Sequence, residues 1–223
     1  MKKLNLLAIS AAVAGVIVSS AAVAADVSAN LGLATQYYFR GVQQTTGAAA
    51  QGGVDYGHES GAYAGIWASD VGGHDGSSAG IETDYYFGYG GEVEDFSYGI
   101  GYTLYTYTGD FDTEYSEINL SGGYGPLSLE FSTGTHEEGA TDADYTFTAV
   151  TYEYESLSAT YGVWGSDFEG AYLEIGFSKE ISELDFGISI INGDAEDSPS
   201  AGSTNVATDG TALVLTIGKS FDL

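Results

Sequence analysis

Carboxylates are the side chains of this sequence whose types and spacing suggest chemistry. The chain of 223 residues holds 32 Asp and Glu against 5 Lys and Arg, and its formal net charge is −27. Some of these acids occupy alternate positions in short segments, opposite apolar residues: Glu82, Asp84, Glu117, Glu130, Glu174 and Asp185. Acidic side chains that line a water-filled path attract cations and repel anions. The pattern therefore predicts a lining that favours cations or small cationic solutes, while the alternative is that the acids only keep an interior wet.

Arg40 is the only arginine of the chain and the one basic residue that we expect among those acids. A guanidinium group can bind a carboxylate through two parallel hydrogen bonds. Glu82 and Asp84 are expected near the same level, but their segment does not neighbour that of Arg40, so a contact stays undecided. Two interpretations remain open. Arg40 either forms part of a constriction that shapes the electric field, or it locks a loop to the wall.

Tyrosines interleave with the same acids. Tyr38, Tyr86 and Tyr105 fall on the predicted inner faces, where their rings could stack on sugars or aromatic solutes. Such residues more often fill a small barrel or form hydrogen bonds with its wall. Tyr38 and Tyr105 join Arg40 and the six acids as candidates for residues that line a pore.

Catalysis and metal binding find little support in the residue pattern. A hydrolase needs a nucleophile, a histidine and an orienting group that converge on one site. His58, His74 and His136 fall in expected turns and loops, and none lies on a strand face beside a suitable serine. No loop has the ligand spacing of a calcium-binding hand. We therefore expect no enzyme activity, no metal site and no cofactor.

The elements that must position these side chains are segments of about ten residues in which apolar and polar residues alternate, as in β-strands. After residue 25 no apolar run approaches the ~20 residues of a membrane-spanning helix. The first four segments are expected at 27–40, 48–56, 62–70 and 81–90. The pattern predicts an all-β fold, a single antiparallel transmembrane β-barrel of about 12 strands, with 10 or 14 strands as alternatives and a soluble β-sandwich as the rival fold.

The connections between these segments alternate in length. Short turns are expected near 57–61 and 91–95, and longer loops at 71–79 and 192–210. Outer-membrane barrels have short periplasmic turns and longer external loops, so an even strand number places both termini in the periplasm. Loop 192–210 is the best candidate to fold inward and narrow the barrel.

Four residues are expected on the outer face at the membrane interface, where aromatic rings form girdles and long lysine side chains reach toward water. They are Trp67, Lys179, Lys219 and Phe221.

Residues 1–25 have the features of a cleaved signal peptide. Lys2 and Lys3 precede a short apolar stretch, and cleavage is expected after Ala24 or Ala25. Residues 26–223 then form one exported domain, which we expect in the bacterial outer membrane. Its partners would be outer-membrane lipid and lipopolysaccharide, the barrel-insertion machinery and small solutes or cations. The acid surplus opposes nucleic acid as a partner, and the pattern does not define an oligomeric state.

Three stretches resemble a known family. They are SANLGLATQYYFRGVQQT (28–45), QGGVDYGHESGAYAGIWAS (51–69) and ETDYYFGYGG (82–91). They resemble the TorF family of outer-membrane porins, most specifically through Tyr-x-Phe-Arg-Gly at 37–41. The resemblance implies an outer-membrane barrel through which small solutes diffuse passively, and it supplies no substrate or functional residues. The alternatives are a closed structural or adhesive barrel without transport and, less favoured, an outer-membrane hydrolase.

Overall fold

The computed structural model describes residues 26–73, 78–139, 141–194, 206–207 and 210–223. The predicted signal peptide, His74 and most of the loop between 195 and 209 lie outside these residues. Within them the chain is all β. No helix in this part of the chain is long and apolar enough to cross a membrane.

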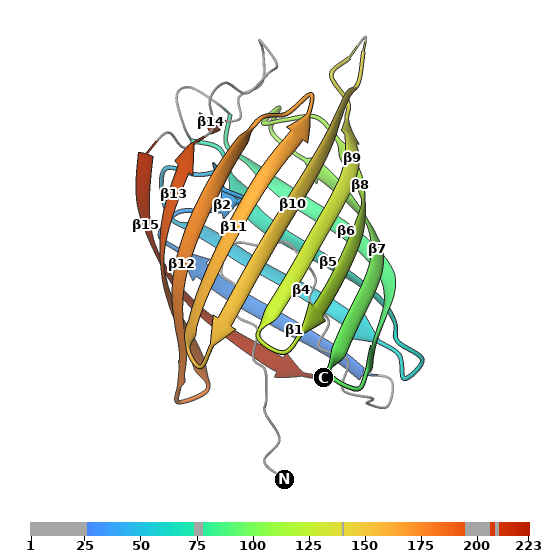
Figure 1. Cartoon of the computed structure of the whole chain (residues 1–223). Coiled ribbons are helices and arrows are strands. Elements are labelled where there is room, and N and C mark those ends of the chain that lie inside the picture. Colours follow the sequence, from blue (N-terminus) through green and yellow to red (C-terminus); the bar gives the residue numbers. More distant parts are fainter. Residues whose placement is uncertain (1–25, 74–77, 140, 195–205, 208–209) are drawn as a thin grey trace.

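Twelve long strands form one closed antiparallel barrel, in the order β1-β15-β13-β12-β11-β10-β9-β8-β7-β6-β5-β4 (Figure 1). Their bounds are β1 (Asp26–Ala34), β4 (Ala49–Gly57), β5 (Ala62–Val71), β6 (Gly80–Val93), β7 (Phe96–Tyr107), β8 (Tyr115–Tyr124), β9 (Leu127–His136), β10 (Ala143–Tyr154), β11 (Leu157–Ser166), β12 (Gly170–Ile181), β13 (Leu184–Asp194) and β15 (Gly210–Asp222). The first and last strands close the barrel, because Leu33 pairs with Ile217 and Leu31 with Lys219. This confirms the predicted 12-stranded barrel, and closure leaves no strand edge unpaired.

Apolar side chains cover the outside of the barrel. On β1, Leu31 is 64% and Leu33 56% exposed, and Leu213, Leu215 and Ile217 take the same face of β15. Every second residue points to the same side of a strand, so this pattern continues around the sheet. A bilayer would cover such a face, and a closed sheet satisfies all its backbone hydrogen bonds without water.

The two ends of the barrel differ in their connections. Adjacent strands are joined at one end by short turns, which we call the turn end, and at the other by longer segments, the loop end. β1 begins and β15 ends at the turn end (Figure 1). In the turn between β12 and β13, Ser182 and Glu183 have φ angles of 54° and 62°. Positive φ at both central residues matches the twist of a tight hairpin.

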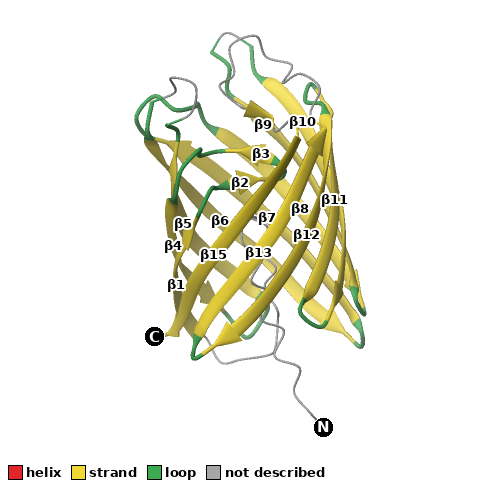
Figure 2. Cartoon of the chain, turned by 90° about the vertical axis from the view of Figure 1, so that its left-hand side faces the viewer, coloured by secondary structure: helices red, strands yellow, loops and turns green. Residues whose placement is uncertain are grey.

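The first expected strand, 27–40, is too long. β1 ends at Ala34, and the chain then enters the barrel, where it forms the short strands β2 (Tyr38–Phe39) and β3 (Val42–Gln43). β3 also pairs with β14 (Val206–Ala207). Figure 2 shows β2 and β3 within the outline of the barrel near the loop end.

Segment 35–48 therefore enters the barrel and narrows it, whereas most of loop 192–210, the expected candidate, lies outside the described residues. From that loop, β14 adds a strand to the inner hairpin. Tyr37 and Phe39, which continue the apolar alternation of β1, lie inside instead of on the outer face.

Candidate functional site

The inner segment turns on two residues. Phe39 pairs with Val42, so Arg40 and Gly41 form the turn of the β2–β3 hairpin. Their φ angles are 48° and 82°, as a type I′ turn requires. A Cβ at Gly41 would lie 2.7 Å from the Cβ and Cγ atoms of Tyr172 on β12. Both the backbone and the neighbouring wall therefore require glycine, which gives the Arg-Gly pair of the Tyr-x-Phe-Arg-Gly motif a structural reason.

The Arg40 side chain joins this hairpin to the barrel wall. Its Nη1 donates to Glu117 Oε2 at 2.8 Å and its Nη2 to Glu117 Oε1 at 2.9 Å. Nη2 also donates to Glu130 Oε1 at 2.6 Å and to Ser132 Oγ at 3.0 Å. The Arg40 and Glu117 side chains are fully buried, and that of Glu130 is 21% exposed. Glu117 of β8 thus binds the guanidinium in the bidentate manner that arginine favours, and Glu130 of the neighbouring β9 adds a single hydrogen bond.

Burial by itself would lower the pKa of Arg40. The negative charges of Glu117 and Glu130 reverse this effect and raise the pKa above its ordinary value. Arg40 therefore carries its positive charge at neutral pH.

Three aromatic rings surround the guanidinium group. Its Cζ lies 4.4 Å from the ring centroid of Phe147, 4.8 Å from that of Phe39 and 5.7 Å from that of Trp164. Trp164 Nε1 also donates to the Arg40 carbonyl oxygen at 3.1 Å. Cation–π contacts strengthen when the cation is shielded from water, so rings and carboxylates hold the turn of the hairpin together.

Tyr37 anchors the hairpin on β6, two strands along the wall from Glu117 of β8. Its hydroxyl donates to Glu82 Oε1 at 2.7 Å, and its backbone N–H donates to Thr45 Oγ1 at 2.9 Å. Burial raises the pKa of the Tyr37 phenol, and the negative charge of Glu82 raises it further. The phenol therefore stays protonated and can donate to the carboxylate.

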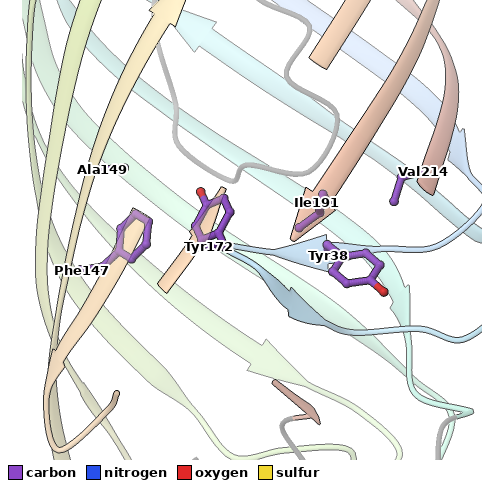
Figure 3. Packing of buried hydrophobic residues seen from close by; sticks show 6 residues of the cluster. All are labelled: Tyr38, Phe147, Ala149, Tyr172, Ile191 and Val214. Atoms are coloured by element: carbon purple, nitrogen blue, oxygen red, sulfur yellow. The ribbon is translucent and has the colours of Figure 1, made fainter. Parts of the chain in front are cut away.

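Tyr38 packs the hairpin against a third part of the wall. It belongs to a buried apolar cluster with residues of β10, β12, β13 and β15, namely Phe147, Ala149, Tyr172, Ile191 and Val214. Figure 3 shows these side chains gathered from separate strands beside Tyr38. Together with the contacts of Tyr37 and Arg40, this packing attaches the hairpin to strands around most of the barrel.

The interior has two halves that differ in burial. Inner residues between the level of the hairpin and the loop end are buried, and we call this region the hairpin half. They include Ala34, Ala49, Ser69, Val71, Glu82, Asp84, Thr103, Tyr105, Glu117, Ser132, Tyr145, Phe147, Tyr172, Ile191 and Val214. Inner residues from the level of the hairpin to the turns form what we call the turn half. Most of them are partly exposed and small, although Asp185 and Ser189 of β13 are buried. The partly exposed ones include Asn30, Gly53, Asp55, Gly65, Tyr86, Gly88, Ser97, Gly99, Gly101, Asn119, Ser128, Thr151, Ser158, Thr160 and Gly187.

The pore-lining candidates divide between these regions. Tyr38, Arg40, Glu82, Asp84, Tyr105 and Glu117 are buried in the hairpin half. Glu130 and Glu174 lie on inner faces with partial exposure, and Asp185 is buried near the turn end of β13. The structure brings Arg40, Tyr105, Glu117 and Glu130 into one network, in which the Tyr105 hydroxyl donates to Glu117 Oε1 at 2.6 Å. Arg40 hydrogen-bonds to neither Glu82 nor Asp84 among the described contacts; its carboxylate partners are Glu117 and Glu130.

Three of the four residues expected as interface anchors lie on the outer face. Lys179, Lys219 and Phe221 lie on the outer face toward the turn end. Lys219 Nζ lies 3.0 Å from Glu183 Oε2 and 5.6 Å from the Phe221 ring centroid. The expectation for Trp67 is wrong. Its side chain lies on the inner face of β5, 5.6 Å from the Tyr37 ring centroid, because the outer face of β5 carries alanines and Ile66.

Several residues of the network were not singled out from the sequence. Tyr145 donates to Glu117 Oε2 at 3.0 Å, and Trp164, Phe147 and Ser132 contact Arg40. The alternation of Tyr145, Phe147 and Ala149 marks an inner face only once the register with β9 is known. Sequence spacing alone carries no such information.

The histidines that the structure describes lie at the two ends. His58 Nδ1 is 2.9 Å from Ser60 Oγ in a turn. His136 ends β9, stacks on Tyr115 with ring centroids 3.8 Å apart, and lies 3.1 Å from Asp112 Oδ1. Among the described residues, no three His, Cys, Asp or Glu side chains are arranged to hold a metal ion.

Comparison with known proteins gives a family but no activity. Residues 19–221 match the family model described as "Bacterial protein of unknown function (Gcw_chp)". The chain belongs to this family. No curated protein matches the sequence.

Among solved structures, the barrel is similar to porins. Two mutants of the Rh. blastica porin share 10% and 11% sequence identity with it, and each alignment covers 90% of this chain and 99% of the porin at a TM-score of 0.37. A structure titled "Asymmetric conductivity of engineered proteins" shares 11% identity over the same shares of the two chains, at a TM-score of 0.35.

Proposed function

We propose that this Gcw_chp-family barrel lies in the outer membrane and is a narrow path for the passive diffusion of small solutes, with cations favoured. The observation that carries the proposal is the charge of the inner wall. Carboxylates occupy inner positions on many strands: Asp55, Glu82, Asp84, Glu117, Glu130, Glu153, Glu174, Glu180 and Asp185. Arg40, on the inner hairpin, is the only Lys or Arg side chain in the interior among the described residues.

The pairing of Arg40 strengthens this charge argument. Glu117 and Glu130 hold the guanidinium at hydrogen-bond distance, so its positive charge is compensated locally. The remaining acids then set the sign of the potential in the interior. An acid-lined passage concentrates cations and lowers the entry of anions.

The hairpin limits the size of what can pass. It lies in the interior at the level where inner residues become buried. The interior of a barrel widens with the number of strands, and side chains alone fill one of about eight strands; in this barrel of twelve strands the hairpin occupies part of the interior as well. We therefore expect a conductance well below that of a wide, unobstructed porin.

Purified protein in a planar lipid bilayer under a salt gradient tests the proposal. The reversal potential is expected to have the sign of a cation-selective path. Replacing Asp55, Glu153 and Glu174 by Asn or Gln is expected to shift it toward zero. Glu183→Gln, on an 82% exposed side chain outside the barrel, is the control and should leave it unchanged. Anion preference in the wild-type protein would contradict the proposal.

A closed structural or adhesive barrel is the second candidate, and the buried attachment of the hairpin favours it. The Arg40 and Glu117 side chains have no solvent exposure, and Tyr37 and Tyr38 are only 1% and 3% exposed. Folded protein that inserts into bilayers and never conducts would support this candidate.

The export route belongs to the same proposal. Residues 1–25 would be removed as a signal peptide, both ends of the mature barrel would face the periplasm, and lipopolysaccharide would contact the loop end. The relation to the TorF porins rests on the resemblance of 28–45, 51–69 and 82–91. N-terminal sequencing of protein extracted from outer membranes tests the route, with a start at residue 25 or 26 as the expected result.

A further inference from the structure

Asp84 is an uncompensated carboxylate in the hairpin half. It is 1% exposed, and neither of its oxygens has a hydrogen-bond partner among the described residues. Two other acids at this level have hydrogen-bond partners, since Glu82 accepts from Tyr37 and Glu117 accepts from Arg40. A buried carboxylate without a partner is strongly unfavourable while it is charged, so Asp84 either binds a proton or receives a cation.

Aromatic side chains flank Asp84 on both sides. In the sheet it pairs with Trp67 of β5 and with Tyr105 of β7, and all three side chains point inward. Residues paired in this way have Cβ atoms about 5 Å apart. Tyr86 follows on the same face of β6 and is partly exposed in the turn half. Asp84 thus lies where the buried region begins, within reach of a solute that enters from the turn end.

A buried carboxylate between two aromatic side chains favours one class of cation. A divalent metal ion needs several oxygen ligands, and the described residues hold no such group. One carboxylate between aromatic rings suits an ammonium group on a small organic molecule. Its N–H groups can donate to both carboxylate oxygens, and its charge is attracted by the ring faces. Arg40 does not oppose this, because Glu117 and Glu130 compensate its charge.

We infer that Asp84, between Trp67 and Tyr105, is a binding subsite for the ammonium group of a small organic cation that enters from the turn half. The inference rests on the proposed function for the source of its ligand, since the same acid-lined interior would deliver the cation. Binding at the subsite does not require that the cation crosses the barrel.

Tryptophan fluorescence tests the subsite without any measurement of transport. The chain has two tryptophans, so Trp164→Phe leaves Trp67 beside Asp84 as the sole reporter. Methylammonium chloride is expected to change its fluorescence along a saturable curve, whereas sodium chloride at equal ionic strength is not. Asp84→Asn in the same background is expected to weaken the apparent affinity at least tenfold. Asp144→Asn, on the exposed outer face of β10, is the matched control and should keep the wild-type curve.

A second probe covers the case in which Trp164→Phe does not fold. The methylammonium-dependent rise in melting temperature is then measured for the wild-type protein and for Asp84→Asn, and only the wild-type protein is expected to show it. The inference is overturned if folded protein shows no saturable response, if sodium gives the same response, or if Asp84→Asn retains it. Saturable binding without conductance would uphold the subsite and refute only the channel, while conductance without binding would refute only the subsite.

Discussion

The hairpin half and the turn half are built from the same twelve strands, yet they differ in what the inner faces carry. In the hairpin half, tyrosines, Phe147 and the Arg40 ion pairs are buried against a chain segment that has left the wall. In the turn half, glycine, serine and threonine line a wall that stays partly exposed. The alternation of apolar and polar residues along the strands therefore accounts for the barrel wall. The size of the inner residues and the path of segment 35–48 determine which part of the interior is filled.

The comparison also bears on the two interpretations of Arg40. Its contacts join a loop to two wall strands through Glu117 and Glu130, which is the geometry of a lock. The same contacts keep the hairpin in the interior, so the lock also produces the narrowing. A solute that crosses the barrel must pass beside Arg40. If it enters from the turn end, the first buried carboxylate that it meets on β6 is Asp84.

The largest effect is expected from Arg40→Met. It leaves the buried carboxylate of Glu117 without its only charged partner among the described residues, and breaking a buried ion pair in this way costs about 3–5 kcal/mol. Chemical unfolding in detergent micelles should show this loss of stability, and bilayer conductance should rise as the hairpin detaches.

The double variant Arg40→Met/Glu117→Gln is the control for that prediction. Because it removes the unpaired charge as well, part of the stability should return. Equal stability of Arg40→Met and the wild-type protein would show that the hairpin is not fastened by this pair.

Gly41→Ala is expected to have the next largest effect. The new Cβ would meet Tyr172 at 2.7 Å in a backbone conformation with φ of 82°, so strain and overlap should cost about 3 kcal/mol. Gly47→Ala is the matched control in the same segment, because nothing lies within 4 Å of its added Cβ. Comparable unfolding curves for the two variants would contradict the hairpin geometry.

Replacement of a hydrogen-bonded tyrosine by phenylalanine in each of the two halves gives the third prediction. Tyr37→Phe removes a donor to buried Glu82 and should cost about 2 kcal/mol, because a buried carboxyl group loses one of its hydrogen bonds. Tyr86→Phe removes the donor to the partly exposed Asp55 in the turn half. Water can replace that donor, so its cost should be smaller. A Tyr86→Phe variant that is less stable than Tyr37→Phe in chemical unfolding would contradict this difference between the halves.

The smallest effect is expected outside both halves. Lys219→Ala removes a contact with Glu183, which is 82% exposed, and exposed ion pairs contribute less than about 1 kcal/mol. The unfolding curve of Lys219→Ala should nearly match that of the wild-type protein, at low and at high salt concentration. A loss as large as that of Arg40→Met would mean that the turn end, rather than the hairpin, carries the stability of the barrel.

The barrel could be predicted from the sequence because strand alternation is local. Leu31 and Leu33, or Leu213 and Leu215, show the outer face without any knowledge of neighbours. The hairpin could not be predicted, because Tyr37 and Phe39 continue the alternation of β1 after the chain has left the wall. The break is visible only in long-range contacts such as that of Tyr37 with Glu82.

The residue types of the candidate site could be predicted from the sequence, but not which of these residues contact each other. Arg40 and the acids were singled out by type and alternation, and several of them do meet. Which acid binds Arg40 depends on where β8 and β9 lie around the barrel, and no local pattern encodes that position. Trp67 illustrates a related limit. Hydrophobicity assigned it to the lipid face, although β5 places alanines outside and its aromatic rings inside.

Thiol accessibility on one strand tests the difference between the halves most directly. The chain has no cysteine, so single replacements report without background. Ser128 and Ser132 share the inner face of β9; Ser128 lies in the turn half, and Ser132 has no exposure and contacts Arg40. A cationic methanethiosulfonate reagent should modify Ser128→Cys at least tenfold faster than Ser132→Cys, and adding Arg40→Met should make the second site reactive. Equal rates at the two sites in otherwise wild-type protein would contradict a barrel that is filled in one half and accessible in the other.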